Sequence, residues 1–297
     1  MAALGGAVAA ATAVQVTKLR DAASEPESGL ARRVQRKRVI LVTGAASGIG
    51  LRTVQMFMAK GWFVGAFDIN EDALEKALGD SVSLVKGIVD VCDAESCKRA
   101  VQTLCSAAPG GAVDVLFNCA GILSIGEFER IPLERQQSII DINCKGVINM
   151  TMACLPALKE SRGCIVSMAS LSAVAGVPFH ATYAASKAFV FSFTEGLRSE
   201  LVQYGVRVCD VSVDYVSSPM TATQNWSQGT FMAKKNFATT GQVACKVWDA
   251  VNQATRFNEH FFVDDATRFA FRMSPLSRAL GLSYHTKAVA QSTSAKL

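Results

Sequence analysis

Charged residues are scarce in this chain of 297 residues, at 19%, whereas hydrophobic residues make up 50%. A disordered chain has the opposite balance, so this composition excludes one. The 22 Gly and 7 Pro are too few for a collagen-like or low-complexity protein. Histidine is rarer still. The chain has 3 His, none grouped with Cys at the spacing of zinc ligands, so we predict no metal site.

The net charge of +5 lies at the two ends of the chain. Residues 1–38 hold seven Lys or Arg against three Asp or Glu, and residues 266–297 hold five Lys or Arg and no acid. The body between them carries a net charge of −4. A nucleic-acid-binding domain presents a basic face. The acidic body, with no recognition motif, therefore predicts a protein that does not bind nucleic acid.

The nine cysteines are scattered and form no CxxC pair. We interpret them as reduced thiols, most of them in the core, which predicts a cytoplasmic protein. We predict that residues 1–37 form a disordered leader. Their apolar start is too short and too rich in Ala and Gly for a membrane span. Import into an organelle through this leader stays open. The run RRVQRKR (32–38) is either a nuclear or phosphate-binding patch or, more commonly, a solvated approach to a strand.

From residue 38 onward, short apolar strands alternate with helical segments. Strands are expected at 38–44, 62–68, 82–90, 113–121, 163–170, 206–213 and 260–264. Helices are expected at 48–61, 71–78, 94–108, 134–159, 181–205 and 242–256. This alternation predicts an α/β fold with a doubly wound parallel sheet, the three-layer αβα Rossmann arrangement. We expect one domain over residues 38–297, with no linker inside it.

The sequence TGAASGIG (43–50) joins the first expected strand to the first helix. Gly44 permits a tight turn, Gly48 lets backbone approach a phosphate, and Gly50 lets the helix lie against the sheet. The helix N-terminus then offers free N–H groups to a pyrophosphate. A purely structural turn is the alternative, but the order of strand, turn and helix favours dinucleotide binding.

Asp68 ends the second expected strand, about 20 residues after the glycines. An acid at this place accepts hydrogen bonds from an adenosine ribose and repels a 2′-phosphate. Ser47 and Ile69 are expected near the same pocket, and they offer no positive charge for that phosphate. We therefore predict NAD as the cofactor, preferred over NADP. A surface acid at a strand end is the alternative.

Tyr183 and Lys187 lie four residues apart in YAASK, on one face of an expected helix. A neighbouring ammonium stabilises a phenolate, so we expect Lys187 to lower the pKa of Tyr183 from about 10. Ser170 follows the strand at 163–169, and its hydroxyl is placed to bind a substrate carbonyl. Asn143 is expected to anchor a water that links Lys187 to solvent. A surface pair on a helix is the alternative for Tyr183 and Lys187.

These pieces together resemble the short-chain dehydrogenase/reductase family, in its shorter, non-epimerase branch. The matching pieces span about residues 43–220 in the family's order and spacing: TGAASGIG, Asp68, Asp90, NCAG (118–121), Asn143, Ser170 and YAASK. The resemblance implies hydride transfer between a nicotinamide cofactor and an alcohol or ketone. It also implies that the chain forms a homodimer or homotetramer that pairs the helices at 134–159 and 183–203.

The resemblance implies a role for each matched residue. The catalytic group is Asn143, Ser170, Tyr183 as acid/base, and Lys187. Asp90 and Val91 would contact the adenine, and Asn118, Ala120 and Gly121 would line the adenine ribose. The full set of implied cofactor-binding residues is Gly44, Ser47, Gly48, Ile49, Gly50, Asp68, Asp90, Val91, Asn118, Ala120, Gly121, Tyr183, Lys187, Val216 and Ser218.

One segment departs from the family pattern. After the sixth strand the family usually has Pro-Gly, and this chain has Val213 and Asp214 there. Val216 and Ser218 still occupy the positions that clamp the nicotinamide carboxamide in the family. A substrate lid is expected at about 214–240. The altered turn supports an alternative function, a catalytically weak protein that binds NAD as a sensor.

The expected substrate side is mostly apolar. It comprises Ile122, Leu123, Ile125, Phe128, Val177, Phe179, Trp226 and Phe231, with His180 as a polar member. These residues favour a small hydrophobic alcohol or ketone as substrate, and ordinary core packing is the alternative. The C-terminal extension, 266–297, contains a basic amphipathic segment at 267–281. That segment either makes weak contact with a membrane surface or closes over the substrate cleft.

Overall fold

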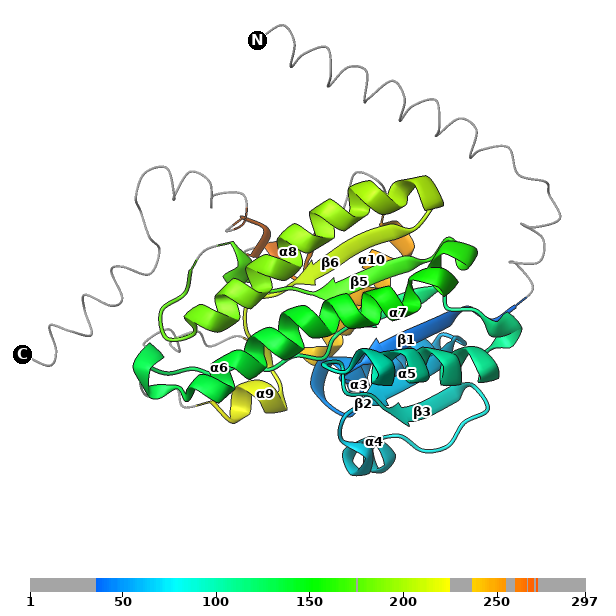
Figure 1. The fold of residues 1–297 in the computed structure, drawn as a ribbon, viewed down its shortest axis with the longest axis horizontal. Coiled ribbons are helices and arrows are strands. Elements are labelled where there is room, and N and C mark those ends of the chain that lie inside the picture. Colours follow the sequence, from blue (N-terminus) through cyan, green and yellow to red (C-terminus); the bar gives the residue numbers. More distant parts are fainter. Residues whose placement is uncertain are drawn as a thin grey trace, which may run out of the picture.

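A parallel sheet of seven strands organises the described part of the chain, in the order β3-β2-β1-β4-β5-β6-β9 (Figure 1). The computed structural model describes residues 36–174, 176–224, 237–254, 260–265, 267–269 and 271. The strands are β1 (Val39–Thr43), β2 (Phe63–Asp68), β3 (Leu84–Ile88), β4 (Val115–Asn118), β5 (Cys164–Met168), β6 (Arg207–Ser212) and β9 (His260–Phe262). A separate parallel pair joins β7 (Val216–Ser217) to β8 (Ala238–Thr239).

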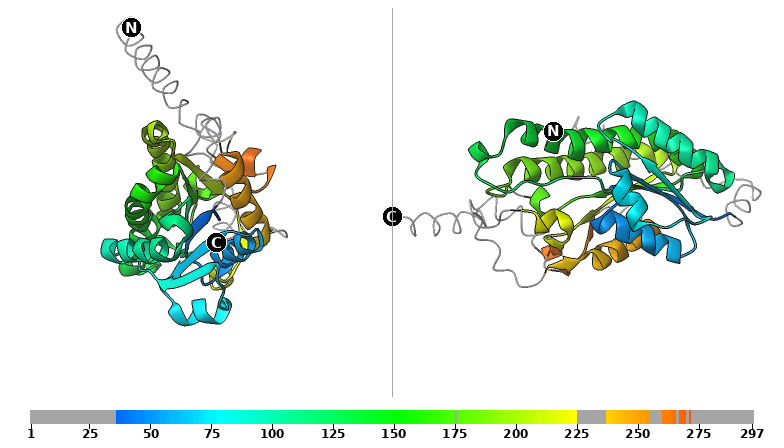
Figure 2. Two further views of the ribbon diagram at one scale, coloured as in Figure 1. Left: turned by 90° about the vertical axis from the view of Figure 1, so that its right-hand side faces the viewer. Right: turned by 90° about the horizontal axis from the view of Figure 1, so that it is seen from below.

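Helices cover both faces of the sheet, so the molecule has three layers (Figure 2). One face carries α3 (Gly48–Ala59), α4 (Glu71–Ala77) and α10 (Thr240–Gln253), and the other carries α5 (Ala94–Ala107), α7 (Gly146–Ser161) and α8 (Ala181–Leu201). Successive β1 side chains enter opposite cores, Ile40 on the α3 side and Leu41 on the α5 side. Because both faces are covered, every β1 residue is buried. The predicted Rossmann arrangement is confirmed.

The strand order reverses direction between β1 and β4. The chain passes outward from β1 to β2 and β3, and then returns to the other side of β1 with β4, β5 and β6. In such sheets the loops leaving the carboxyl ends of the two central strands diverge, and a crevice opens between them. This topology therefore places the glycine turn after β1 next to the loop after β4.

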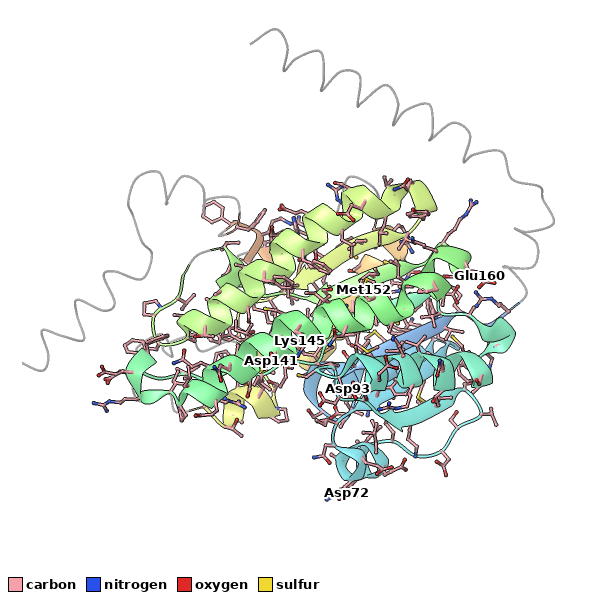
Figure 3. All side chains as sticks on the ribbon, viewed as in Figure 1. Asp72, Asp93, Asp141, Lys145, Met152 and Glu160 are labelled. Carbon is pink, nitrogen blue, oxygen red and sulfur yellow. The ribbon has the colours of Figure 1, made fainter. Side chains whose placement is uncertain are left out.

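The long helix expected at 134–159 is three segments in the structure. The chain forms α6 (Leu133–Ile140), a π-helical turn (Asp141–Lys145) and α7. Asp141 and Lys145, labelled in Figure 3, mark the ends of that turn. A π-helical turn inserts a residue into the α-helical ladder, which hydrophobic periodicity does not reveal. Another difference is at α10, which begins two residues early because Thr239 and Gln242 form a capping box.

The basic run at 32–38 is described only from Arg36. Arg36 forms a two-pronged ion pair with Asp114, at 2.7 Å for each N–O contact, and Asp114 also accepts from the Val39 N–H. Lys37 donates to Ser83, and the Arg38 guanidinium lies 4.1 Å from the centre of the Trp62 ring. These three cations therefore attach the start of the domain to the sheet.

Parts of the expected leader, lid and extension lie outside the described residues. These parts are residues 1–35, residues 225–236 with Trp226 and Phe231, and residues 272–297, which include most of the segment 267–281. At the start of that segment, the Phe271 ring lies 5.0 Å from Phe262 of β9 and 5.3 Å from Phe191 of α8, whereas Phe269 is 66% exposed. Within the described part of the chain, no helix has both the length and the apolar character that a membrane crossing requires.

Candidate active site

A cavity of about 490 Å³ lies at the carboxyl ends of the central strands. Its walls come from the glycine turn, the end of β2, the loops after β3, β4 and β5, helix α8 and the segment 213–221. One end holds Asp68 and Asp90, and the other holds Ser170, Tyr183 and Lys187. The structure thus brings these seven separate stretches of sequence to one site.

The glycine turn needs glycine for two different reasons. Gly44 has φ +68°, and a Cβ there would lie 2.9 Å from the Cα of Ala120, so the turn and the β4 loop touch through backbone. A Cβ on Gly50 would collide with the carbonyl of Gly44. We expected Gly50 to allow contact between helix and sheet. Its nearest neighbour is instead the turn itself, so Gly50 lets the helix begin directly after the bend.

Thr43 joins the two sides of the crevice, and the sequence analysis did not identify it. Its hydroxyl accepts from the N–H groups of Cys119 and Ala120, each at 3.1 Å. The residue is 1% exposed at the end of β1. A buried hydroxyl at a strand end that faces a predicted ligand loop is the signal that points to this role.

The Asp68 carboxylate is oriented by two backbone groups. Oδ2 accepts from the Ala46 N–H at 2.9 Å, and Oδ1 accepts from the Asn70 N–H at 3.0 Å. Each oxygen keeps a further lone pair for a ligand hydroxyl. Ser47, the N-cap residue of α3, makes no side-chain cap, and Ile49 also lines the cavity. Asp68 is thus held at the cavity wall.

Asn118, which the resemblance placed at the adenine ribose, does not line the cavity. Asp90 and Val91 line the cavity, and Asp90 Oδ1 accepts from the Cys92 N–H at 2.8 Å. Asn118 is 3% exposed and outside the cavity lining, where its amide donates to Thr151 at 3.3 Å. β4 ends at Asn118, and the loop residues that follow it, Cys119, Ala120 and Gly121, form the wall instead.

Helix α8 presents Tyr183 and Lys187 to the cavity one turn apart. The Lys187 ammonium lies 5.6 Å from the centre of the Tyr183 ring and donates to the Met168 carbonyl at 2.8 Å. Ser170 follows β5 and caps a short 3₁₀ helix (Leu171–Ala173), where its hydroxyl accepts from the Ser172 N–H. Ser170 also acts on Tyr183, whose pKa it lowers slightly. The predicted meeting of Ser170, Tyr183 and Lys187 is present in the structure.

Burial changes the pKa of both α8 groups. Loss of water raises the pKa of Tyr183 to about 12, against a smaller lowering from the Ser170 hydrogen bond. It lowers the pKa of Lys187 to about 8. We expected Lys187 to lower the pKa of Tyr183, and the chain's own groups do not produce that effect. Each group is desolvated, so each favours its neutral form.

Asn143 lies in the π-helical turn and acts on the loop after β4. Its Oδ1 accepts from the Ile122 N–H at 2.9 Å, and its Nδ2 donates to the Ile122 carbonyl and to Ser186, each at 3.0 Å. Both amide hydrogens are therefore committed to the protein. A Cβ on Gly121 would lie 3.1 Å from Asn143 Oδ1 and 3.8 Å from Lys187 Nζ, so glycine is what lets these groups come close. For the expected water, the Asn143 side chain keeps one lone pair of Oδ1.

The segment after β6 forms the remaining wall. Val213 is 4% exposed and packs in the core, and it lines the cavity together with Asp214, Val216 and Ser218. Tyr215 also lines it, and the sequence analysis did not name this residue. Burial and the nearby Tyr183 raise the pKa of Tyr215, which keeps its phenol neutral.

Four of the expected substrate-side residues line the cavity: Ile122, Leu123, Ile125 and His180. Phe128 and Phe179 instead border a separate void of about 30 Å³ behind Tyr183, and Phe128 is 67% exposed. Val177 is buried. Among the described residues, no three His, Cys, Asp or Glu side chains lie close enough together to hold a metal ion.

Comparison with known proteins identifies the family. The family model "short chain dehydrogenase" matches residues 38–229, so the chain belongs to the short-chain dehydrogenase family. The 3-oxoacyl-acyl-carrier-protein reductase of Thermotoga maritima is 35% identical over 190 residues, which cover 62% of this chain and 76% of that one. The D-threitol dehydrogenase of Mycolicibacterium smegmatis is 34% identical over 212 residues, which cover 70% and 80%.

Solved structures agree with this assignment. A 3-ketoacyl-acyl-carrier-protein reductase from Brucella melitensis, complexed with NADH, superposes with a TM-score of 0.69 and 26% identity, over 77% of this chain and 97% of that one. A short-chain dehydrogenase from Burkholderia cenocepacia, in complex with NADP, superposes with a TM-score of 0.70 over 82% and 95%. At 22% identity, the second comparison supports the fold alone.

Proposed function

We propose that this protein transfers hydride between NAD and a hydrophobic secondary alcohol or ketone, with Tyr183 as the acid/base. The observation that carries the proposal is the convergence of Ser170, Tyr183 and Lys187 at one end of a cavity whose other end holds the glycine turn and Asp68. The membership of the short-chain dehydrogenase family supports the same reaction class. So does the NADH named for the Brucella melitensis structure.

The residues present fit a dinucleotide. Gly48 has φ +54° and no side chain between the turn and Ser218, which leaves backbone N–H groups open to a phosphate. Asp68 keeps free lone pairs for a ribose, and Lys187 and Gly121 bound the opposite end. When bound, the nicotinamide would supply or accept the hydride.

The chain's own groups handle the proton and the substrate oxygen. Ser170 donates a hydrogen bond to that oxygen. Tyr183, with a pKa of about 12, carries its proton at neutral pH and donates it to a ketone oxygen as the alcohol forms. Lys187, with a pKa of about 8, is cationic at neutral pH, and its ammonium stabilises the phenolate that remains. Oxidation of an alcohol uses the same groups in reverse.

The preference for NAD is supported by charge. Asp68 repels a 2′-phosphate, and Lys187 is the only Lys or Arg in the described cavity lining, at the far end from Asp68. We expect kcat/KM to be higher with NAD than with NADP. A clear preference for NADP would contradict this assignment.

The substrate class is supported by the apolar wall formed by Leu123, Ile125 and Met220. The experiment is a panel of hydrophobic alcohols with NAD and of the matching ketones with NADH, comparing wild type with Tyr183→Phe. The variant keeps the ring and loses the acid/base, so we expect kcat to fall by about 100-fold or more. Equal activity in both proteins would contradict the mechanism. NADH binding without activity in either protein would favour the alternative function, a catalytically weak protein that binds NAD as a sensor.

We also propose a homodimer or homotetramer that pairs α6, α7 and α8 with a second copy. Exposed apolar side chains on this face support it: Ile140 is 42% exposed, Ile148 is 38% exposed and Met152, labelled in Figure 3, is 64% exposed. Met152→Asp should shift the protein toward monomer in sedimentation velocity, because a buried unpaired charge opposes association. Unchanged sedimentation would argue against this interface.

A further inference from the structure

A short helix after β7 crosses the mouth of the cavity. Helix α9 (Pro219–Ala222) begins beside the glycine turn, where Ser218 and Pro219 lie 3.8 and 3.9 Å from the position of a Cβ on Gly48. Two residues beyond its end, Gln224 Oε1 accepts from the Ile125 N–H at 3.1 Å. The helix and Gln224 therefore connect the dinucleotide end of the cavity to the substrate loop after β4.

The two ends of the segment from Ser218 to Gln224 are held by different contacts. Near Ser218, β7 pairs with β8, and the Thr221 hydroxyl donates to the Val216 carbonyl at 2.6 Å. At the other end, the bond from Ile125 to Gln224 is the one hydrogen bond between residues 218–224 and residues 119–132 that the structure describes. Release of that bond would remove the one described link between α9 and the loop after β4, while the described contacts near Ser218 stay in place.

The Gln224 amide is oriented before it meets Ile125. Its Nε2 donates to the Met220 carbonyl at 3.0 Å, one helical turn back, which directs Oε1 away from α9. Gln224 and Ile125 are both half-buried, so water competes only partly for the bond. The amide is therefore a preoriented acceptor just beyond the C-terminal end of the helix.

The receiving loop is fixed on both sides of Ile125. Arg135 of α6 donates to the Leu123 carbonyl at 3.0 Å and to the Ser124 hydroxyl at 2.8 Å. The Gly126 N–H donates to the Phe179 carbonyl at 2.8 Å. None of these bonds involves α9. The Ile125 N–H is therefore a fixed docking point for α9.

We infer that Gln224 is a positioning residue, a latch that holds α9 closed across the cavity and so prolongs the residence of the bound dinucleotide. The part concerning the dinucleotide rests on the proposed function, and the latch itself does not. Met220 and Thr221 of α9 line the cavity, so the position of α9 sets the shape of the mouth. One neutral hydrogen bond shifts such an equilibrium by about 3- to 10-fold, which suits a latch that must also open.

The test compares Gln224→Met with Gln224→Glu. Methionine keeps the size of the side chain without the polar group, whereas glutamate keeps an acceptor for the Ile125 N–H. Gln203→Met is the matched control, because Gln203 is exposed and its amide bonds only within its own turn, to the Glu200 carbonyl. Two quantities are measured: amide hydrogen exchange at Ile125 without any cofactor, and the rate of NADH dissociation by stopped-flow fluorescence.

We expect Gln224→Met to speed both exchange at Ile125 and NADH dissociation by about 3- to 10-fold. KM for NAD should rise while kcat does not fall, and Gln203→Met should stay close to wild type. Gln224→Glu keeps the acceptor for Ile125 but loses the bond to the Met220 carbonyl, so it should fall between Gln224→Met and wild type. Unchanged exchange in Gln224→Met would overturn the latch. Faster exchange with unchanged NADH dissociation would overturn its effect on the ligand. If wild type binds no NADH, the proposed function fails and the exchange result alone decides the latch.

Discussion

At the dinucleotide end of the cavity, backbone meets backbone. Gly44 touches the Cα of Ala120, Gly50 lies on the Gly44 carbonyl, and Asp68 is held by two N–H groups. At the substrate end, side chains from separate elements hold the loop after β4. Backbone contacts tolerate almost no added atom, whereas side-chain contacts break and form one at a time. The first end is thus suited to recognise a constant ligand, and the second to admit and release a variable one.

The largest effect is expected from Gly50→Ala, a substitution at the dinucleotide end of the cavity. The new Cβ collides with the Gly44 carbonyl, and backbone cannot move aside as a side chain can. We expect a loss of about 3 kcal/mol or more in unfolding free energy, together with loss of NADH binding. Gly79→Ala is the control, since a Cβ at Gly79 meets nothing within 4 Å. Denaturant unfolding and fluorescence titration measure both, and equal behaviour of the two variants would contradict a backbone-built site.

Asp68→Ser tests whether one carboxylate selects the cofactor. Removing the charge removes both the ribose acceptor and the repulsion of a 2′-phosphate. The ratio of kcat/KM for NAD to that for NADP should fall by about 10- to 100-fold, the effect of losing a charged hydrogen bond. Asp72→Ser, at an exposed acid on α4 labelled in Figure 3, should leave the ratio unchanged. A preserved ratio in Asp68→Ser would assign the selection to another residue.

The catalytic end can be probed through the pH dependence of stability. The folded-state pKa of Lys187, about 8, lies below its ordinary value of 10.5, so the unfolded chain binds more protons between these values. Stability contributed by this group therefore rises with pH across that window. Between pH 8 and pH 10 we expect wild type to gain about 2 kcal/mol more than Lys187→Met. Lys98→Met, at an exposed ion pair, should keep the wild-type profile in denaturant unfolding. Parallel profiles of Lys187→Met and wild type would mean that Lys187 keeps an ordinary pKa.

The smallest effect is expected at the turn after β6. Val213→Pro with Asp214→Gly restores the pair that is usual in the family, but Val213 already packs in the core and its carbonyl already accepts from the Leu171 N–H. We expect KM for NAD or kcat to change by only about 2- to 5-fold, less than 1 kcal/mol. Steady-state kinetics measure it. No change in either constant would show that the present turn is already adequate.

The sheet and the cavity end at the glycine turn were predictable because they depend on local signals. Apolar runs between helical segments predicted every strand of the large sheet, and glycine spacing predicted the turn. The π-helical turn at Asn143, the burial of Asn118 outside the cavity lining and the roles of Thr43, Tyr215 and Gln224 were not predicted. Each depends on a neighbour far along the chain, such as Ile125, which lies 99 residues from Gln224.

The sequence by itself therefore determined the order of elements, the family and the residues that meet at the reacting end, since hydrophobic period and motif spacing are properties of the chain alone. Tertiary structure decided which of those residues face the cavity and how their protons are held. The pKa values of Tyr183 and Lys187 depend on desolvation by surrounding elements, and the described link between Gln224 and the loop after β4 is one hydrogen bond across the crevice. Burial and long-range contacts form only when the helices pack onto the two faces of the sheet.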